Sequence, residues 1–313
     1  MPKKLLFFWG LLICSLFSSW GFYAHKRINQ AAVFTLPSEL AVFYKKYIDI
    51  ITERAVDADK RCYVDSLESP RHFIDIDEYT EDVLDSIPVH WSKAKEKYQE
   101  KKLLAQGIVP WQIAFTYQKL IKAFREKEPE AIIKHTADLG HYIADAHVPL
   151  HTTSNYNGQQ TGQIGIHAFW ESRLPEMFAS SYNLLVGKAQ YVRSPLDSAW
   201  QIIKESHALV DSVLLIEKNL SKEFPPHLQR SYIPRNNILV ATYSDQYASA
   251  YHYRMNGMVE RRMRQSIQRI GSFWMSAWID AGQPQLRSVY DTRKTSSSSE
   301  QSSGRILGRE EWH

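Results

Sequence analysis

Apolar residues recur at helical spacing through most of this 313-residue chain. Between residues 37 and 56 one helical face would carry Leu40, Phe43, Tyr44, Tyr47, Ile48 and Ile51. The same pattern predicts further helices over 111–127, 129–146, 167–178, 196–220 and 236–281. Alternating runs of β-branched residues are almost absent. The sequence therefore predicts an all-α fold, a single-domain helical bundle.

Proline and glycine indicate where these helices begin and end. Pro129 stands at a first helical position, where its missing amide hydrogen is not needed. Pro149 follows the same helix and ends it. The final range, 236–281, is long for one uninterrupted helix, so we expect a kink or break near Gly257 or Gly271.

The first 19 residues have the pattern of a secretory signal peptide. Lys3 and Lys4 precede an uncharged apolar run, residues 5–17, and two serines follow it. We expect cleavage before Trp20 and an exported protein, either periplasmic or secreted.

Removing the leader, 1–19, leaves one domain over 20–287 and a Ser-rich tail over 288–313 that we expect to be disordered. The 38 basic residues become 36 against 34 acidic ones, a balance that argues against a nucleic-acid scaffold. Cys62 is the single cysteine outside the leader, so the mature chain cannot form an internal disulfide. An exported chain of this kind depends on its core, and bound metal would add to that support.

Histidine and carboxylate residues gather around the end of the predicted 129–146 helix. His141 and Asp145 lie four residues apart, so both project from one helical face. His151 comes two residues after Pro149, which ends the helix and lets the imidazole turn toward a neighbouring metal ion.

The same spacing recurs downstream, where Glu171 follows His167 by four residues. Upstream, Asp57 precedes His72 by fifteen residues. Taken alone, each pair is more often an ordinary surface pair than a metal site. Together they offer the nitrogen and oxygen ligands that zinc accepts without any thiolate.

Cleavage before Trp20 would add one more candidate ligand. A free α-amine and its own carbonyl oxygen can chelate a metal ion together, and His25 lies five residues further on. The remaining histidines form no comparable pattern. Among them His147 is the nearest candidate, because it lies between Asp145 and His151.

These motifs together resemble the superfamily that joins bacterial zinc-dependent phospholipases C to the single-strand-specific zinc nucleases of fungi and plants. The resemblance covers residues 20–171. It rests on Trp20, His25, Asp57, His72-Phe-Ile-Asp75, His141…Asp145…Pro149-Leu-His151 and His167…Glu171, all in the family's order.

The resemblance implies three zinc ions and hydrolysis of a phosphodiester by a zinc-activated hydroxide. The implied ligands are Asp57, His72, His141 and Asp145 for the first ion, His151, His167 and Glu171 for the second, and Trp20, His25 and a bridging Asp145 for the third. Asp57 also falls where the family has a carboxylate that orients or deprotonates the attacking water. Phe73 and Asp75 fall where the nucleases bind a base, although core packing and a local turn explain them equally well.

The substrate stays open between two branches of this superfamily. The spacing from Trp20 to His25 favours a nuclease that cleaves single-stranded nucleic acid or nucleotides. Glu171 in place of Asp fits a phospholipase C acting on phospholipid head groups, and the lack of disulfides suits a bacterial relative of either branch. A catalytically inactive, zinc-stabilised binding protein is the third reading, and it predicts gaps among the ligands that the sequence does not show. No stable protein partner is implied, and we expect a monomer.

Overall fold

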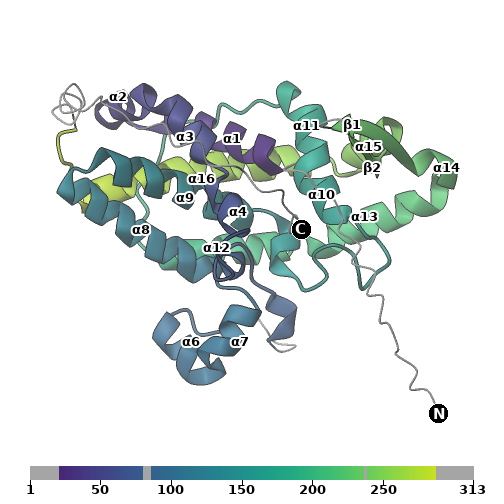
Figure 1. Ribbon diagram of the computed structural model, residues 1–313, viewed down its shortest axis with the longest axis horizontal. Helices are drawn as coiled ribbons and strands as arrows, with labels where there is room; N and C mark the ends of the chain where they lie inside the picture. The colour runs from purple at the N-terminus through teal and green to yellow at the C-terminus, as the bar shows by residue number, and fades with distance from the viewer. Residues whose placement is uncertain (1–20, 80–85, 236–237, 287–313) are drawn as a thin grey trace, which may run out of the picture.

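The computed structural model describes residues 21–79, 86–235 and 238–286. Over these residues it confirms the all-α fold, with one two-stranded hairpin added (Figure 1). The predicted leader, Trp20 and the Ser-rich tail lie outside the described residues. Within the described ranges, none of the helices has both the length and the apolar character needed to cross a membrane.

Long helices packed side by side form the body of the molecule. In chain order they are α1 (Gly21–Ala32), α8 (Val109–Glu126), α9 (Pro129–Ala146), α12 (Pro195–His207) and α16 (Met258–Asp280). Helix α9 lies between α8 and α1, and α16 crosses both α1 and α8 (Figure 1). The core is formed mainly by the aliphatic and aromatic side chains on their facing surfaces.

Helix α9 is the central element, and it spans the predicted range. From Thr136 to Ala146 every residue is buried, which is the pattern of a helix covered on all sides. Gly140 allows α1 to come unusually close, because a Cβ at this position would lie 2.0 Å from Asn29 Oδ1. This close approach brings α1 against the part of α9 that carries polar residues.

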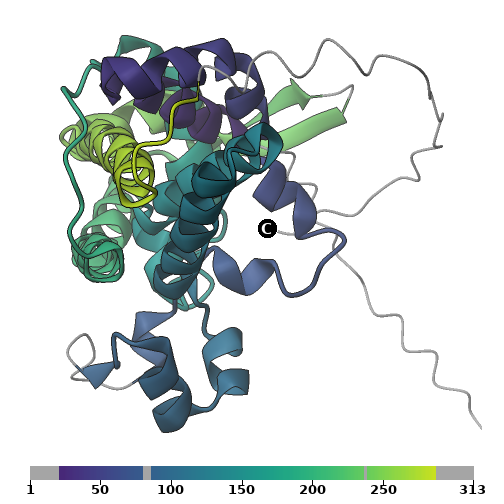
Figure 2. The ribbon, with the colours of Figure 1, turned by 90° about the vertical axis from the view of Figure 1, so that its left-hand side faces the viewer.

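The segments around the body are shorter than the sequence pattern indicates. The predicted helix over 37–56 is divided into α2 (Ser38–Lys46) and α3 (Ile48–Arg54), and α4 (Asp57–Arg61) follows. Helices α6 (Trp91–Tyr98) and α7 (Glu100–Ala105) extend away from the body in both views (Figures 1 and 2). Short 3-10 turns complete this half of the chain: η1 (Val33–Thr35), η2 (Ser69–Arg71), η3 (Ile76–Glu78) and η4 (Pro149–Thr152).

The predicted 167–178 helix consists of three consecutive pieces. They are α10 (Ile166–Ala168), the π-helical turn η5 (Phe169–Arg173) and α11 (Leu174–Phe178), with the 3-10 turn η6 (Ala179–Ser181) after them. Beyond α12, the predicted 196–220 helix continues as a separate helix, α13 (Val210–Glu223), and α14 (Pro226–Gln229) is a single turn.

The predicted helix over 236–281 is wrong in its first part. Strand β2 (Ile238–Tyr243) pairs antiparallel with β1 (Arg230–Arg235), from Arg230 opposite Tyr243 to Arg235 opposite Ile238. The segment contains Ile, Val and Thr, whose branched side chains favour strands. Helix α15 (Asp245–Arg254) then precedes α16, and the expected break falls at Gly257, whose φ is 72°. Gly271 lies inside α16 and interrupts nothing.

Candidate metal centre

Three groups of histidine and carboxylate side chains, each able to hold a metal ion, lie next to one another around α9. The groups are His25, His141 and Asp145; Asp59, His72 and His141; and His151, His167 and Glu171. Seven of the nine ligands predicted from the sequence are therefore brought together. The two others are Trp20, which lies outside the described residues, and Asp57.

The group of Asp59, His72 and His141, with Asp145 beside it, has the separations expected of zinc ligands. Atoms placed about 2.0–2.1 Å from one tetrahedral zinc ion stand about 3.3 Å from one another. His141 Nε2 lies 3.0 Å from His72 Nδ1 and 3.3 Å from Asp59 Oδ1. Asp145 Oδ2 lies 3.1 Å from His141 Nε2 and 2.9 Å from His72 Nδ1. Asp59 and Asp145 thus each place a carboxylate oxygen beside the facing nitrogens of His72 and His141.

Asp59, and not Asp57, is the upstream carboxylate of this group. Both residues belong to α4, where positions two apart point about 200° away from each other. Asp57 turns outward and forms ion pairs with Arg54 Nε at 3.3 Å and Lys60 Nζ at 3.1 Å. The structure therefore replaces Asp57 with Asp59 as the candidate ligand and candidate catalytic carboxylate. Basic residues three positions before and after Asp57 were the signal in the sequence that marked it as a surface residue.

The group of His151, His167 and Glu171 is the most exposed of the three. His151 Nε2 and His167 Nε2 lie 2.8 Å apart, and Glu171 Oε2 lies 3.1 Å and 2.8 Å from these two nitrogens. Glu171 is carried by the π-helical turn η5, an uncommon geometry that often marks functional sites.

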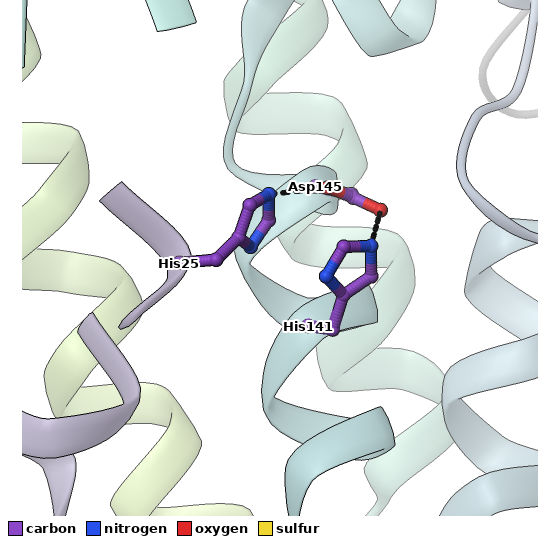
Figure 3. Close-up of side chains that lie close together, drawn as sticks. All are labelled: His25, His141 and Asp145. Atoms are coloured by element: carbon purple, nitrogen blue, oxygen red, sulfur yellow. Dashed lines mark ion pairs between the residues drawn. The ribbon is translucent and has the colours of Figure 1, made fainter. Parts of the chain in front are cut away.

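His25 lies between the other two groups and contacts both through one nitrogen. Its Nε2 is 3.2 Å from Asp145 Oδ1, an ion pair marked in Figure 3. The same nitrogen is 3.2 Å from Glu171 Oε1. Each carboxylate thus turns one oxygen to His25 and the other to its own group. The ring of His25 also stacks on that of His141, with centroids 4.2 Å apart. Gly21 at the start of α1 is close by, since a Cβ there would lie 3.0 Å from Glu171 Oε1.

Hydrogen bonds on the far side of the rings orient two of these histidines. His141 Nδ1 lies 2.8 Å from the carbonyl oxygen of Ala55, and His151 Nδ1 lies 2.7 Å from that of His72. A carbonyl only accepts, so each Nδ1 donates and leaves the Nε2 lone pair directed at the cluster. Metal-binding histidines in proteins are held in this way.

A buried carboxylate, Glu68, lies behind His72, and no pattern in the sequence indicates it. Glu68 is fully buried and receives bonds from Arg61, whose Nη2 and Nε lie 3.1 Å and 3.2 Å from its two oxygens. Tyr142 and Arg71 also donate to it. His72 Nε2 lies 3.7 Å from Glu68 Oε1, so this network holds the imidazole from the side opposite the cluster. A carboxylate behind a ligating histidine raises its basicity.

The electrostatics of the cluster favour a bound cation. Burial alone would oppose the ionisation of Asp145. The neighbouring histidines, His141 foremost, nevertheless hold the pKa of Asp145 well below its usual range. His151 and His167 likewise hold the pKa of Glu171 well below its usual value. In the described part of the chain the ion-pair partners of both carboxylates are histidines. Buried carboxylates without a Lys or Arg partner fit a divalent metal ion, and these donors fit zinc.

Phe73 and Asp75 follow His72 and are both half-buried. Phe73 packs against Gly107, where a Cβ would lie 2.2 Å from the Phe73 carbonyl oxygen. Burial, with the nearby carboxylates of Asp77 and Glu78, raises the pKa of Asp75 to about 7. Neither observation decides between packing and substrate contact for Phe73 and Asp75.

His147 is excluded from the cluster by its contacts. Its Nδ1 lies 2.7 Å from the carbonyl oxygen of Ile143, and its Nε2 accepts from Arg269 Nη1 at 3.2 Å. Burial, together with Arg262 and Arg269, holds the pKa of this imidazole well below its usual value. His147 is a buried core residue, and only these contacts separate it from the cluster that its place between Asp145 and His151 made it a candidate for.

Comparison with known proteins gives limited information about this chain. No family model matches it, and no curated protein matches it. One similar solved structure is the alpha toxin from Clostridium absonum, at a TM-score of 0.46 and 12% identity over 82% of this chain. The match covers 64% of the toxin chain, so this chain spans less than two thirds of that length. The function has to follow from the residues of the chain itself.

Proposed function

We propose that this chain is an exported zinc-dependent phosphodiester hydrolase that cleaves single-stranded nucleic acid or nucleotides. The observation that supports this proposal is that Asp145 and Glu171 each direct their two oxygens to two adjacent ligand groups. Asp145 directs its two oxygens to His141 and His25, and Glu171 directs its two to His151 and His25. Shared carboxylates of this kind hold metal ions a few ångströms apart, as phosphodiester hydrolases with two metals require.

We propose that the cluster binds three zinc ions. We assign Asp59, His72, His141 and Asp145 to the first, His151, His167 and Glu171 to the second, and His25, Asp145 and the α-amine and carbonyl of Trp20 to the third. Bound zinc would lower the pKa of a coordinated water toward 7 and neutralise charge on phosphoryl oxygens.

The surrounding side chains would position the reactants. The Asp59 side chain is 13% exposed and can orient a water molecule or accept its proton, the role first expected of Asp57. Phe73 offers a half-buried ring on which a base can stack, worth about 1–3 kcal/mol. With a pKa of about 7, Asp75 is partly protonated at neutral pH and can donate a hydrogen bond to a base edge.

A phospholipase C acting on lipid head groups is the second candidate. Three large apolar side chains are exposed on loops that lead into the ligands: Val64 (87%), Leu67 (57%) and Ile164 (54%). A lipid surface would cover such side chains favourably, and an apolar approach surface is what this activity requires.

The two candidates are separated by incubating the zinc-loaded mature protein with single-stranded DNA, RNA and phosphatidylcholine vesicles in parallel. We expect cleavage of the nucleic acids, and Asp145→Asn is the inactive control. Preferential hydrolysis of phosphatidylcholine would replace the nuclease proposal with the phospholipase C candidate. Stable zinc binding without hydrolysis of any substrate would support the zinc-stabilised binding protein.

Phe73→Ala tests the base-stacking role. We expect it to keep its zinc and its melting temperature while KM for single-stranded substrate rises about 10-fold, which corresponds to one stacking contact. The matched control is Val64→Ser, which removes an exposed apolar side chain and should leave nucleic-acid cleavage unchanged. A lower melting temperature with unchanged KM would assign Phe73 to packing instead.

A further inference from the structure

The π-helical turn η5, which presents Glu171 to the cluster, is supported by contacts from outside itself. Within the turn, the Leu174 amide donates to the carbonyl oxygen of Phe169, five residues back. Such turns are a rare alternative to the α-helix, so contacts with neighbouring elements help to decide whether a segment adopts one. Strand β2 of the hairpin is one of the elements that pack against η5.

A stack of three side chains connects the hairpin to this turn. Phe169, the first residue of η5, is buried, and its ring lies on that of Tyr243 with centroids 3.8 Å apart and planes 16° apart. The guanidinium carbon of Arg230 lies 3.6 Å from the centre of the Tyr243 ring. Two groups this close to one ring cannot share a face of it, so Tyr243 lies between Arg230 and Phe169. Arg230 and Tyr243 are directly opposite each other in the hairpin, which places their side chains side by side.

Arg230 also reaches the segment that leads to the ligand His167. Its Nη2 donates to the carbonyl oxygen of Ile164 at 2.9 Å. Its guanidinium group lies against Gly165, where φ is 94° and a Cβ would stand 3.6 Å from Nη1. His167 follows two residues later, in α10. One side chain thus contacts the segment before His167 and supports the turn that presents Glu171.

The inner end of the stack is anchored in α13 and α15. The ring of Tyr251 lies on that of Phe169 with centroids 4.9 Å apart, and its hydroxyl donates to a backbone carbonyl of α13 at 2.8 Å. The ring of Tyr247 lies on that of Tyr243, and its hydroxyl donates to the buried carboxylate of Glu217 at 2.7 Å. The stack therefore holds η5 against elements that are themselves fixed by buried hydrogen bonds.

We propose that Arg230 and Tyr243 are positioning residues that hold His167 and Glu171 in place for a metal ion. The stack holds the π-helical turn that presents Glu171, and the bond to the Ile164 carbonyl holds the segment that leads to His167. The positioning itself rests only on these contacts. Its effect on zinc binding rests on the proposed function.

Hydrogen exchange of the zinc-free protein, measured by mass spectrometry on peptides covering 166–174, tests the positioning without metal. Arg230 is exposed, so Arg230→Ala leaves the core in place. We expect these amides to exchange about 10-fold faster, because one cation–π contact and one hydrogen bond are lost. The matched control is Arg254→Ala, which removes an exposed arginine that pairs with Glu223 on α13 at 2.6 Å. Equal exchange over 166–174 in the two variants, or equal acceleration in all helices of Arg230→Ala, overturns the proposal.

Two substitutions of Tyr243 test the consequence for the metal centre. Tyr243→Leu keeps an apolar side chain but removes the stack, whereas Tyr243→Phe keeps the ring. In a zinc titration against a competing chelator, we expect Tyr243→Leu to weaken one zinc equivalent about 10-fold and to leave the others unchanged, as losses behind a ligand do. Tyr243→Phe should bind zinc as the unaltered protein does.

A packing role alone would lower the urea midpoint of Tyr243→Leu without weakening any one zinc equivalent, and that result contradicts the positioning role. A loss of zinc as large in Tyr243→Phe as in Tyr243→Leu contradicts it as well. If the unaltered protein binds no zinc while exchange over 166–174 changes as expected, the proposed function fails and the positioning of the turn stands.

Discussion

Gly140→Ala gives the sharpest test of how the fold builds the metal centre. Helix propensity alone predicts that alanine stabilises α9 by about 1 kcal/mol. The structure predicts the opposite, because the new methyl group would lie 2.0 Å from Asn29 Oδ1 and 3.1 Å from Trp274 Cζ2. Ordinary contact begins near 3.4 Å, so α1 or the Asn29 side chain must move by about 1.4 Å.

Neither movement is free. Asn29 is fully buried and its Nδ2 donates to the carbonyl oxygen of His25 at 3.0 Å, a bond worth about 1 kcal/mol. Overpacking in a core costs about 1–3 kcal/mol. Set against the gain in propensity, we expect Gly140→Ala to lower the free energy of unfolding by about 2 kcal/mol. It should also weaken zinc binding at His25, which α1 carries.

A double-mutant cycle with Asn29→Ala isolates the clash. Without the amide there is space for the methyl group, so Gly140→Ala should then stabilise by about 1 kcal/mol, a coupling of about 3 kcal/mol. Urea unfolding of the zinc-free proteins and zinc titration of the four variants provide the measurements. The reasoning is refuted if Gly140→Ala is the more stable protein, or if it costs the same in both backgrounds.

Three further predictions follow from the site. Asp59→Asn should lower zinc affinity at least about 100-fold in a zinc titration, whereas Asp57→Asn should leave it unchanged. Equal effects of the two substitutions would contradict the choice of Asp59 over Asp57 as the zinc ligand. One residue retained before Trp20 should reduce bound zinc by about one equivalent in metal analysis, and full occupancy would disprove the α-amine ligand. The depressed pKa of His147 means that only the unfolded chain binds its proton, so stability is lost as pH falls below about 6.5. In zinc-free protein, His147→Gln should therefore show a shallower decline of the urea midpoint between pH 6.5 and 5, and parallel curves would contradict this.

Local spacing in the sequence was enough to predict the all-α class and most of the histidines and carboxylates that the structure brings together. His141 with Asp145, and His167 with Glu171, are four residues apart, and on a helix this spacing fixes a shared face whatever lies around it. Pro129 fixed the start of α9 for an equally local reason, its rigid φ and missing amide hydrogen. Trp20 stays a prediction, because it lies outside the described residues.

Only the tertiary structure decided which side of a short helix faces the cluster. Asp57 and Asp59 are chemically identical, and the choice between them depends on how α4 is rotated against α9. The hairpin of β1 and β2 depends likewise on pairing between segments, which a search for helical spacing does not detect. The contact of Gly140 with Asn29 arises where α1 meets α9. Distances between separate elements are set by packing of the whole core, and no local pattern in the sequence contains them.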